Sequence, residues 1–282
     1  NQKDQLQLNG GEKMRIPNIL KQIREAKLEF IPTGFSKLDK ELDGGFLRRE
    51  LVVIGGSSGA GKSFFASQLV LNIAEAGFKC LYLSLEISSQ TIVSRMLGSL
   101  SAIKPARIIG GLLTEEEYQR KLDAEAELLS REGFIEIYDD VYELDKIIEV
   151  VKKAKADLVI IDFIQNVISR GEGEYERMSE ASLALQRLAK SSNSCILVLS
   201  QLSNRVVREE EEAPALEYKG AGTIAQVCDL GFWLWREKID DYTQPREGDK
   251  LKLTLRKNRR GFSGGSFYFL MRFPGGDIYQ LP

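Results

Sequence analysis

The sequence contains no histidine, only three cysteines, and no apolar run approaching the length of a membrane span. A transmembrane helix needs about 20 consecutive apolar residues, and residues 1–13 are too polar for a secretory signal. Without histidine or a CxxC pair, the chain has neither ligands for a structural zinc site nor an imidazole base for a His-based triad. We therefore expect a soluble cytoplasmic protein that does not bind membranes and whose metal, if any, is a hard cation on oxygen ligands.

The three cysteines are Cys80, Cys195 and Cys228, and the first two each open an apolar run. Their odd number and wide separation favour reduced, buried thiols over a disulfide framework.

Charge of one sign is not in excess either. The 282 residues carry 39 Lys and Arg against 41 Asp and Glu, with 43% hydrophobic and 28% charged residues. This near-neutral balance excludes a globally basic nucleic-acid binder but leaves a local basic patch open. Length and composition are those of an ordinary globular protein with one large domain or two small ones.

The chain divides into three parts. Residues 1–13 read as a polar leader or the end of a linker, and residues 14–29 contain an amphipathic segment, Met14 to Leu28, that predicts a linker helix. Packing on its own domain and docking on a neighbouring subunit are both open for this helix. Ile31-Pro32-Thr33-Gly34 then breaks the pattern, and residues 30–282 form the main domain.

Within the main domain, apolar runs alternate with segments of helical periodicity. Strands are predicted at residues 51–54, 80–85, 134–138, 158–161 and 195–199, and helices at 63–76, 88–102, 114–131, 143–155 and 175–191. This alternation predicts an α/β fold with a mainly parallel sheet covered by helices. Strands predicted at 230–235, 251–255 and 267–273 should extend the sheet as an antiparallel C-terminal edge.

The clearest motif is Gly56-Ser57-Ser58-Gly59-Ala60-Gly61-Lys62-Ser63, which fits G-x-x-x-x-G-K-[ST] between a strand and a helix. The glycines let backbone N–H groups turn toward phosphates. Lys62 can reach the β- and γ-phosphate oxygens, and the Ser63 hydroxyl can bind Mg²⁺. The alternative is a glycine-rich turn without a ligand, but such turns rarely supply Gly-Lys-Ser after an apolar strand.

Three further residues close predicted strands at the same carboxyl edge of the sheet. Asp162 is the candidate partner of Ser63 on the metal, Glu86 the candidate general base, and Gln201 a candidate sensor of the γ-phosphate. The competing interpretations are a strand-end turn for Asp162, a helix N-terminal acid for Glu86 and an ordinary loop amide for Gln201.

Several ordered motifs resemble the C-terminal RecA-like motor domain of DnaB-type replicative hexameric helicases over about residues 30–281. They are Thr33-Gly34 with Leu38-Asp39, the P-loop, Ser84-Leu85-Glu86, Arg95-Met96-Leu97, Ile161-Asp162-Phe163-Ile164-Gln165, Leu199-Ser200-Gln201-Leu202 and Lys257-Asn258-Arg259-Arg260-Gly261.

This resemblance implies a P-loop ATPase that uses ATP and Mg²⁺ at the interfaces of a ring, a hexamer in this family, encircling single-stranded DNA. Lys62, Ser63, Glu86, Asp162 and Gln201 would serve the nucleotide of their own subunit. Lys257 and Arg259 match positions that reach the neighbour's site, with Arg259 as an arginine finger. A simple basic patch at a strand end is the alternative for these two residues.

The resemblance also implies two DNA-binding loops, at about residues 169–177 and 204–223. The first contains Arg170 and Arg177, and the second fits best around Lys219, Gly220 and Gly222. Acidic residues in the first loop make a merely solvated segment equally compatible. In the second, Lys219-Gly220 stands where family members usually have an Arg-Glu pair.

Complete family members carry an N-terminal domain that helps form the ring and meets primase. The resemblance thus implies primase and a helicase loader as partners, in a bacterial or phage-infected cell, and it places the helix of residues 14–28 on an adjacent motor domain. The resemblance further implies a hexamer that moves from 5′ to 3′ on DNA.

Two other functions remain open at this point. A RecA-, RadA- or KaiC-like ATPase acting in recombination or regulation would share the P-loop and Glu86, although Leu199-Ser200-Gln201-Leu202 and Lys257-x-Arg259-x-Gly261 favour the helicase. A non-enzymatic ATP-binding scaffold would need neither a base nor a finger, so Glu86, Asp162 and Arg259 argue against it.

Overall fold

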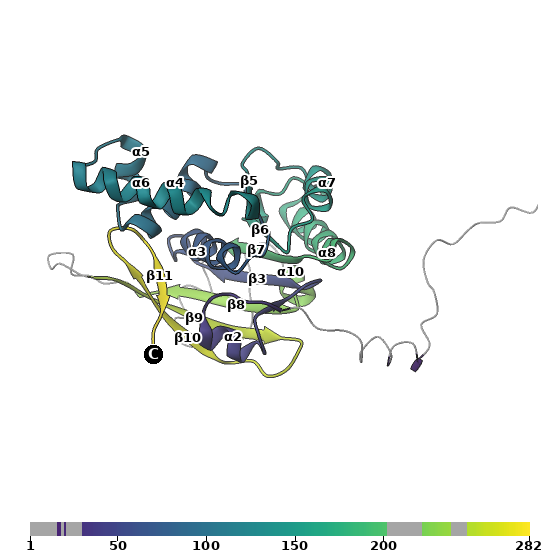
Figure 1. The fold of residues 1–282 in the computed structure, drawn as a ribbon. Helices are drawn as coiled ribbons and strands as arrows, with labels where there is room; N and C mark the ends of the chain where they lie inside the picture. Colours follow the sequence, from purple (N-terminus) through teal and green to yellow (C-terminus); the bar gives the residue numbers. More distant parts are fainter. Residues whose placement is uncertain (1–15, 18–19, 21–29, 202–221, 238–246) are drawn as a thin grey trace, which may run out of the picture.

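The computed structural model describes residues 16–17, 20, 30–201, 222–237 and 247–282. A nine-stranded sheet forms the centre of this part of the chain, in the order β11-β10-β9-β8-β3-β7-β6-β4-β5 (Figure 1). Its strands are β3 (Leu51–Gly56), β4 (Cys80–Ser84), β5 (Ile135–Tyr138), β6 (Leu158–Asp162), β7 (Cys195–Gln201), β8 (Leu230–Arg236), β9 (Gly248–Asn258), β10 (Ser266–Arg272) and β11 (Ile278–Gln280).

The helices cover both faces of this sheet (Figure 1). They are α2 (Ser36–Glu41), α3 (Lys62–Glu75), α4 (Ser89–Ser101), α5 (Pro105–Gly110), α6 (Glu115–Leu129), α7 (Leu144–Ala154), α8 (Glu174–Ser192) and α10 (Gly222–Val227). Two short strands, β1 (Phe30–Ile31) and β2 (Phe46–Leu47), form a separate antiparallel pair. None of the helices in the described ranges is long and apolar enough to cross a membrane.

The central strands are apolar because helices bury them on both sides. All six residues of β3 are buried, and alternate residues face different helices. Val52 and Ile54 share a core with Phe65 of α3, whereas Val53 shares the opposite core with Leu185 of α8. Both faces therefore exclude water, as is typical of parallel sheets.

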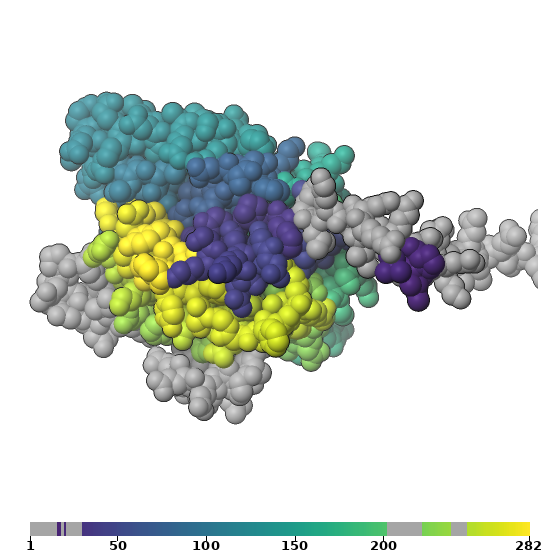
Figure 2. All heavy atoms as spheres, turned by 60° about the horizontal axis from the view of Figure 1, so that its bottom comes forward, coloured from purple at the N-terminus to yellow at the C-terminus, as the bar shows by residue number. Residues whose placement is uncertain are grey.

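The antiparallel strands are tied to the N-terminal part of the domain by aromatic packing. The ring centroids of Phe35, Phe65 and Phe269 lie 4.9 to 5.4 Å apart and join the segment before α2, helix α3 and strand β10. The backbone N–H of Lys37 also donates to Gln280 Oε1 at 2.7 Å. Helix α2 consequently lies against the C-terminal strands, which Figure 2 shows as purple atoms beside yellow ones.

These observations confirm the predicted α/β fold with its antiparallel C-terminal strands. One detail differs: β8 pairs in parallel with β3, and antiparallel pairing begins only between β8 and β9. The short elements β1, β2, α2, α5, α10 and β11 were not predicted.

The expected helix from Met14 to Leu28 lies mostly outside the described residues. Ile16, Pro17 and Leu20 are helical, and the apolar side chains of Ile16 and Leu20 are 71% and 46% exposed.

Candidate nucleotide site

The P-loop connects β3 to α3 as its motif requires. Gly59 and Gly61 have φ values of 77° and 90°, in the left-handed region that glycine tolerates best. Gly61 is the N-cap of α3, so the free N–H groups and positive dipole end of a 14-residue helix begin at the loop. The backbone is therefore shaped to bind an anion.

Lys62 lies across this loop. Its Nζ donates to the carbonyl oxygens of Gly56 and Ser57, at 2.9 Å each. Burial lowers the pKa of the Lys62 ammonium, while the carboxylates of Asp162 and Glu86 oppose that shift. The predicted phosphate-binding cation and the two predicted acidic residues are thus electrostatic neighbours.

Asp162 ends β6 with its side chain buried. Its Oδ2 accepts a hydrogen bond from the Tyr82 hydroxyl at 2.6 Å. Burial raises the pKa of the Asp162 carboxyl, whereas hydrogen bonds from Tyr82 and Ser63 and the charges of Arg95 and Lys62 hold it down. Ser63 and Asp162 therefore lie within reach of each other, as a shared metal site requires.

This oxygen donor pair fits Mg²⁺, which typically takes one or two protein ligands and completes its shell with phosphates and water. Among the described residues, no group of three or more His, Cys, Asp or Glu side chains could hold a metal alone. A metal at this position would thus depend on a phosphate ligand.

The register of the sheet brings the remaining predicted residues to the same edge. Ser84 pairs with Asp162, and Gly56 pairs with Gln201. Glu86 follows β4 by two residues and is exposed at this edge. Gln201 is held from the neighbouring segment, because its N–H donates to Gln165 Oε1 at 3.3 Å and Gln165 Nε2 donates to its carbonyl at 3.1 Å.

The predicted nucleotide residues line one cavity of about 270 Å³. Its lining is formed by Ser58, Gly59, Gly61, Lys62, Ser63, Phe64, Glu86, Ile87, Arg95, Asp162, Phe163, Gln201 and Arg236. Ala60 of the predicted loop is buried. A second cavity of about 620 Å³ shares Phe64, Arg95 and Arg236 with the first and continues over Met271 and Phe273. The polar site thus opens onto a more apolar one.

Four residues of this region were missed by the sequence analysis as site residues: Tyr82, Arg95, Gln165 and Arg236. Arg236 closes β8, donates to Gly59 O at 3.2 Å and pairs with the buried Asp249. The carboxyl-edge rule would have found Arg236 if β8 had been assigned to the parallel part of the sheet. Tyr82 carried a weaker signal, a hydroxyl within an apolar strand that must find a partner when buried.

Lys257 and Arg259 do not join this cavity. Val52 of β3 pairs with Leu230, and Leu230 pairs with Asn258, so the two cations lie beside the first residues of β3. The P-loop begins at the other end of that strand, about 13 Å away at a rise of about 3.3 Å per residue. The two cations and the P-loop therefore occupy opposite edges of the sheet.

The described segments that carry the predicted DNA-binding residues lie next to one another. The Ser169 hydroxyl donates to Arg177 O at 3.0 Å, and the hydroxyls of Ser179 in α8 and Thr223 in α10 are hydrogen-bonded at 2.8 Å. Arg170 is exposed and forms a 3.0 Å ion pair with Asp145, while Arg177 lies in the first turn of α8, which begins at Glu174. The first predicted loop is thus shorter than expected. Gly222 is the first residue of α10, and Lys219 and Gly220 lie outside the described residues.

Comparison with known proteins identifies the family to which the domain is similar. The family model for the DnaB-like helicase C terminal domain matches residues 30–271. The chain is 27% identical over 248 residues to the replicative DNA helicase DnaB of Geobacillus stearothermophilus, covering 84% of this chain and 54% of that relative. It therefore spans about half the length of this curated relative.

Two solved structures share the fold. A DnaB-like replicative helicase, described together with its interactions with primase, has a TM-score of 0.82 at 20% identity, covering 97% of this chain and 68% of that chain. The KaiC-like protein PH0186 from Pyrococcus horikoshii OT3 has a TM-score of 0.63 at 19% identity, covering 90% of this chain and all of that chain. The KaiC-like alternative is thus the less similar fold, and the family match does not favour it.

Proposed function

The chain belongs to the family of DnaB-like helicase C-terminal domains, and from that premise we propose that it is the ATP-hydrolysing motor of a replicative DNA helicase. The motor would act at the subunit interfaces of a homo-oligomeric ring, a hexamer by family resemblance. It would use the energy of ATP to move on single-stranded DNA and unwind duplex.

The observation that carries this proposal is the convergence of Lys62, Glu86, Asp162 and Gln201 on one cavity behind the P-loop. Backbone N–H groups at the start of α3 and the Lys62 ammonium would bind the β- and γ-phosphates. Ser63 and Asp162 would hold Mg²⁺, which neutralises charge on phosphate oxygens when bound.

Glu86 would orient the attacking water and accept its proton, since it is exposed at the cavity next to where the γ-phosphate would lie. Gln201 would hydrogen-bond the γ-phosphate through its amide, without a charge that could compete for the metal. The adjoining cavity at Phe64, Arg236 and Phe273 has the apolar and aromatic lining that a nucleoside requires.

Lys257 and Arg259 support an intersubunit site, because their own P-loop lies at the opposite edge of the sheet. A neighbouring subunit could present both cations to the γ-phosphate. Its guanidinium would stabilise the negative charge of the transition state, so that hydrolysis would depend on how the subunits are arranged.

Mixing two inactive variants tests this arrangement. Arg259→Ala lacks the finger and Glu86→Gln lacks the base, yet an interface pairing the intact base of one with the intact finger of the other would be complete. ATPase activity in the mixture should clearly exceed that of either variant alone. If both variants assemble and the mixture stays inactive, the intersubunit site is wrong.

Single-stranded DNA would be bound by the segments around Arg170, Arg177, Lys219, Gly220 and Gly222. A helicase loader and primase are the further partners that the family resemblance suggests, and one solved relative in fold is described with primase.

A further inference from the structure

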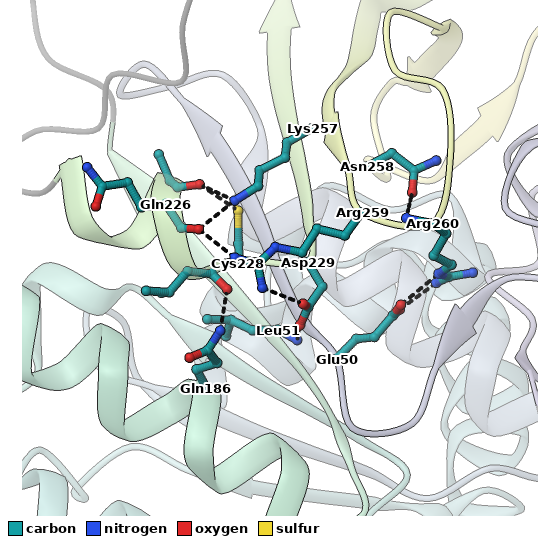
Figure 3. Close-up of polar contacts among 12 residues, drawn as sticks. Glu50, Leu51, Gln186, Gln226, Cys228, Asp229, Lys257, Asn258, Arg259 and Arg260 are labelled. Atoms are coloured by element: carbon teal, nitrogen blue, oxygen red, sulfur yellow. Dashed lines mark hydrogen bonds and ion pairs between the residues drawn. The ribbon is translucent and has the colours of Figure 1, made fainter. Parts of the chain in front are cut away.

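The two cations of the far edge are attached to the end of one short helix. Lys257 Nζ donates to the carbonyl oxygens of Ala225 and Gln226, at 2.7 Å each. Arg259 Nη2 donates to the same Gln226 oxygen at 2.7 Å. The last carbonyls of α10 thus bind both side chains (Figure 3), a favourable arrangement because a helix C-terminus carries partial negative charge.

Asp229 connects this group to the P-loop strand. Its Oδ1 accepts a hydrogen bond from Arg259 Nη1 at 3.1 Å, and its Oδ2 accepts one from the backbone N–H of Leu51 at 2.9 Å (Figure 3). Its main chain does the same, since its N–H donates to Leu51 O at 2.8 Å and its carbonyl accepts from Arg259 N at 3.0 Å. One residue therefore fixes both the backbone and the guanidinium of Arg259 to the first residue of β3.

The side chains of Asp229 and Arg259 differ in their exposure to solvent. The Asp229 side chain is 17% exposed, whereas that of Arg259 is 44% exposed. The carboxylate is thus largely enclosed by the domain, while the guanidinium that it holds faces outward. Burial lowers the pKa of the Lys257 ammonium, and the adjacent charge of Arg259 adds to that shift. Two like charges this close need such anchors to keep one geometry.

We propose that Asp229 is the positioning residue of the arginine finger, holding Arg259 in the orientation in which a neighbouring subunit's nucleotide meets it. This inference rests on the proposed intersubunit site. An arginine side chain has many rotamers, and fixing it before the subunits meet removes an ordering cost from the catalytic step. Because Asp229 binds Leu51 and β3 continues to Gly56, the finger is anchored to the strand that leads into its own subunit's P-loop.

Asp229 is not alone in holding the backbone that follows β9. Arg260 pairs with Glu50 and donates to the carbonyl oxygens of Leu42 and Gly45, at 2.9 and 3.1 Å. These contacts hold the backbone after β9 when the Asp229 charge is removed. Loss of the Asp229 charge should consequently change the orientation of the Arg259 side chain while leaving the fold largely intact.

The first test is Asp229→Asn, which keeps the size of the side chain and removes its charge. We expect kcat for ATP to fall about tenfold, with KM changed less than about twofold, because the substrate is bound by the other subunit's P-loop.

Asp157→Asn is the matched control. Asp157 also accepts a backbone N–H, that of Lys79 at 2.7 Å, and pairs with an arginine, Arg48, at a similar side-chain exposure of 16%. It does not contact Lys257 or Arg259, and its kcat should stay near wild type.

Mixing experiments then assign the defect to one side of the interface. Asp229→Asn mixed with Glu86→Gln should gain activity, because the Glu86→Gln subunit can present an intact finger to the intact base of its partner. Asp229→Asn mixed with Arg259→Ala should gain none beyond the average of the two preparations, since every interface then receives an impaired finger.

The outcomes separate this inference from the proposed function. If Arg259→Ala with Glu86→Gln regains activity but Asp229→Asn with Glu86→Gln does not, the intersubunit site stands and the role of Asp229 is wrong. A raised KM with unchanged kcat, a loss equal to that of Asp157→Asn, or faster turnover would also contradict it. If Asp229→Asn does not fold, Asp229→Glu, which keeps the charge, replaces it and should show the same mixing pattern with a smaller loss.

Discussion

Among the single residues of the site, Glu86 is placed to act in hydrolysis rather than in nucleotide binding. It lies two residues beyond β4, exposed at the cavity that holds Lys62 and Asp162. A carboxylate there can reach a water but contributes little to holding the phosphates, which the P-loop and Lys62 would bind. Binding and hydrolysis should therefore be separable by substitution at this position.

Glu86→Gln should leave nucleotide affinity within about threefold of wild type and reduce ATP turnover by about 10² to 10⁴, the usual contribution of a general base. Binding can be followed with a fluorescent ATP analogue and turnover by phosphate release. Glu75→Gln, at the exposed end of α3, is the control and should retain wild-type turnover. Turnover that survives in Glu86→Gln would assign the base to another residue.

The sequence could predict most of the site because parallel strands end at one edge of the sheet. Asp162 and Gln201 close apolar runs that are readable as strands, and Lys62 and Ser63 belong to a motif with a fixed local geometry. Arg236 was not predicted as a site residue, because the direction of β8 depends on its pairing with β3. That pairing joins residues about 180 positions apart in sequence. Such long-range pairing leaves no local pattern.

At the scale of elements, the long helices and buried strands were predictable and the short ones were not. Periodicity needs several turns or strand residues to emerge, and α2, α5 and α10 have six residues each. Tertiary hydrogen bonds define these elements instead. Helix α10, for example, is bound at its C-terminal end by the side chains of Lys257 and Arg259. The side chain of Gln186 binds the same end, because its Nε2 donates to Val227 O at 2.8 Å.

Arg260 connects the segment after β9 to the loops that flank β2, and its loss should be costly. Its guanidinium pairs with Glu50, and the two side chains are only 17% and 12% exposed. Arg260→Ala leaves that carboxylate largely enclosed without its cation. We expect the free energy of unfolding to fall by about 2–4 kcal/mol, somewhat below the usual cost of breaking a fully buried pair.

Urea unfolding followed by tryptophan fluorescence measures this loss. Lys146→Ala, which removes an exposed pair with Glu143 at 3.2 Å, is the control and should move the midpoint little. An equal effect of the two substitutions would show that the Arg260–Glu50 pair contributes no more than a surface ion pair.

At the scale of the whole molecule, association should depend on apolar residues ahead of the main domain. The side chains of Ile16 and Leu20 are 71% and 46% exposed. If the helix of residues 14–28 docks on an adjacent motor domain, Leu20→Asp should reduce the fraction of oligomer at a given concentration while leaving the unfolding midpoint unchanged.

Size-exclusion chromatography with light scattering measures this fraction, and Leu20→Met, which keeps an apolar side chain, is the control. An unchanged oligomer in Leu20→Asp would contradict docking through this residue.

If this domain converts ATP hydrolysis into movement on DNA, it should unwind a forked duplex. Substrates with a 5′ tail, a 3′ tail or both should be compared, with Lys62→Ala as the control that loses its contact with the β- and γ-phosphates. We expect strand separation that requires ATP, the 5′ tail and an intact Lys62. Unwinding that persists in Lys62→Ala, or ATPase activity that no single-stranded DNA stimulates, would contradict this function.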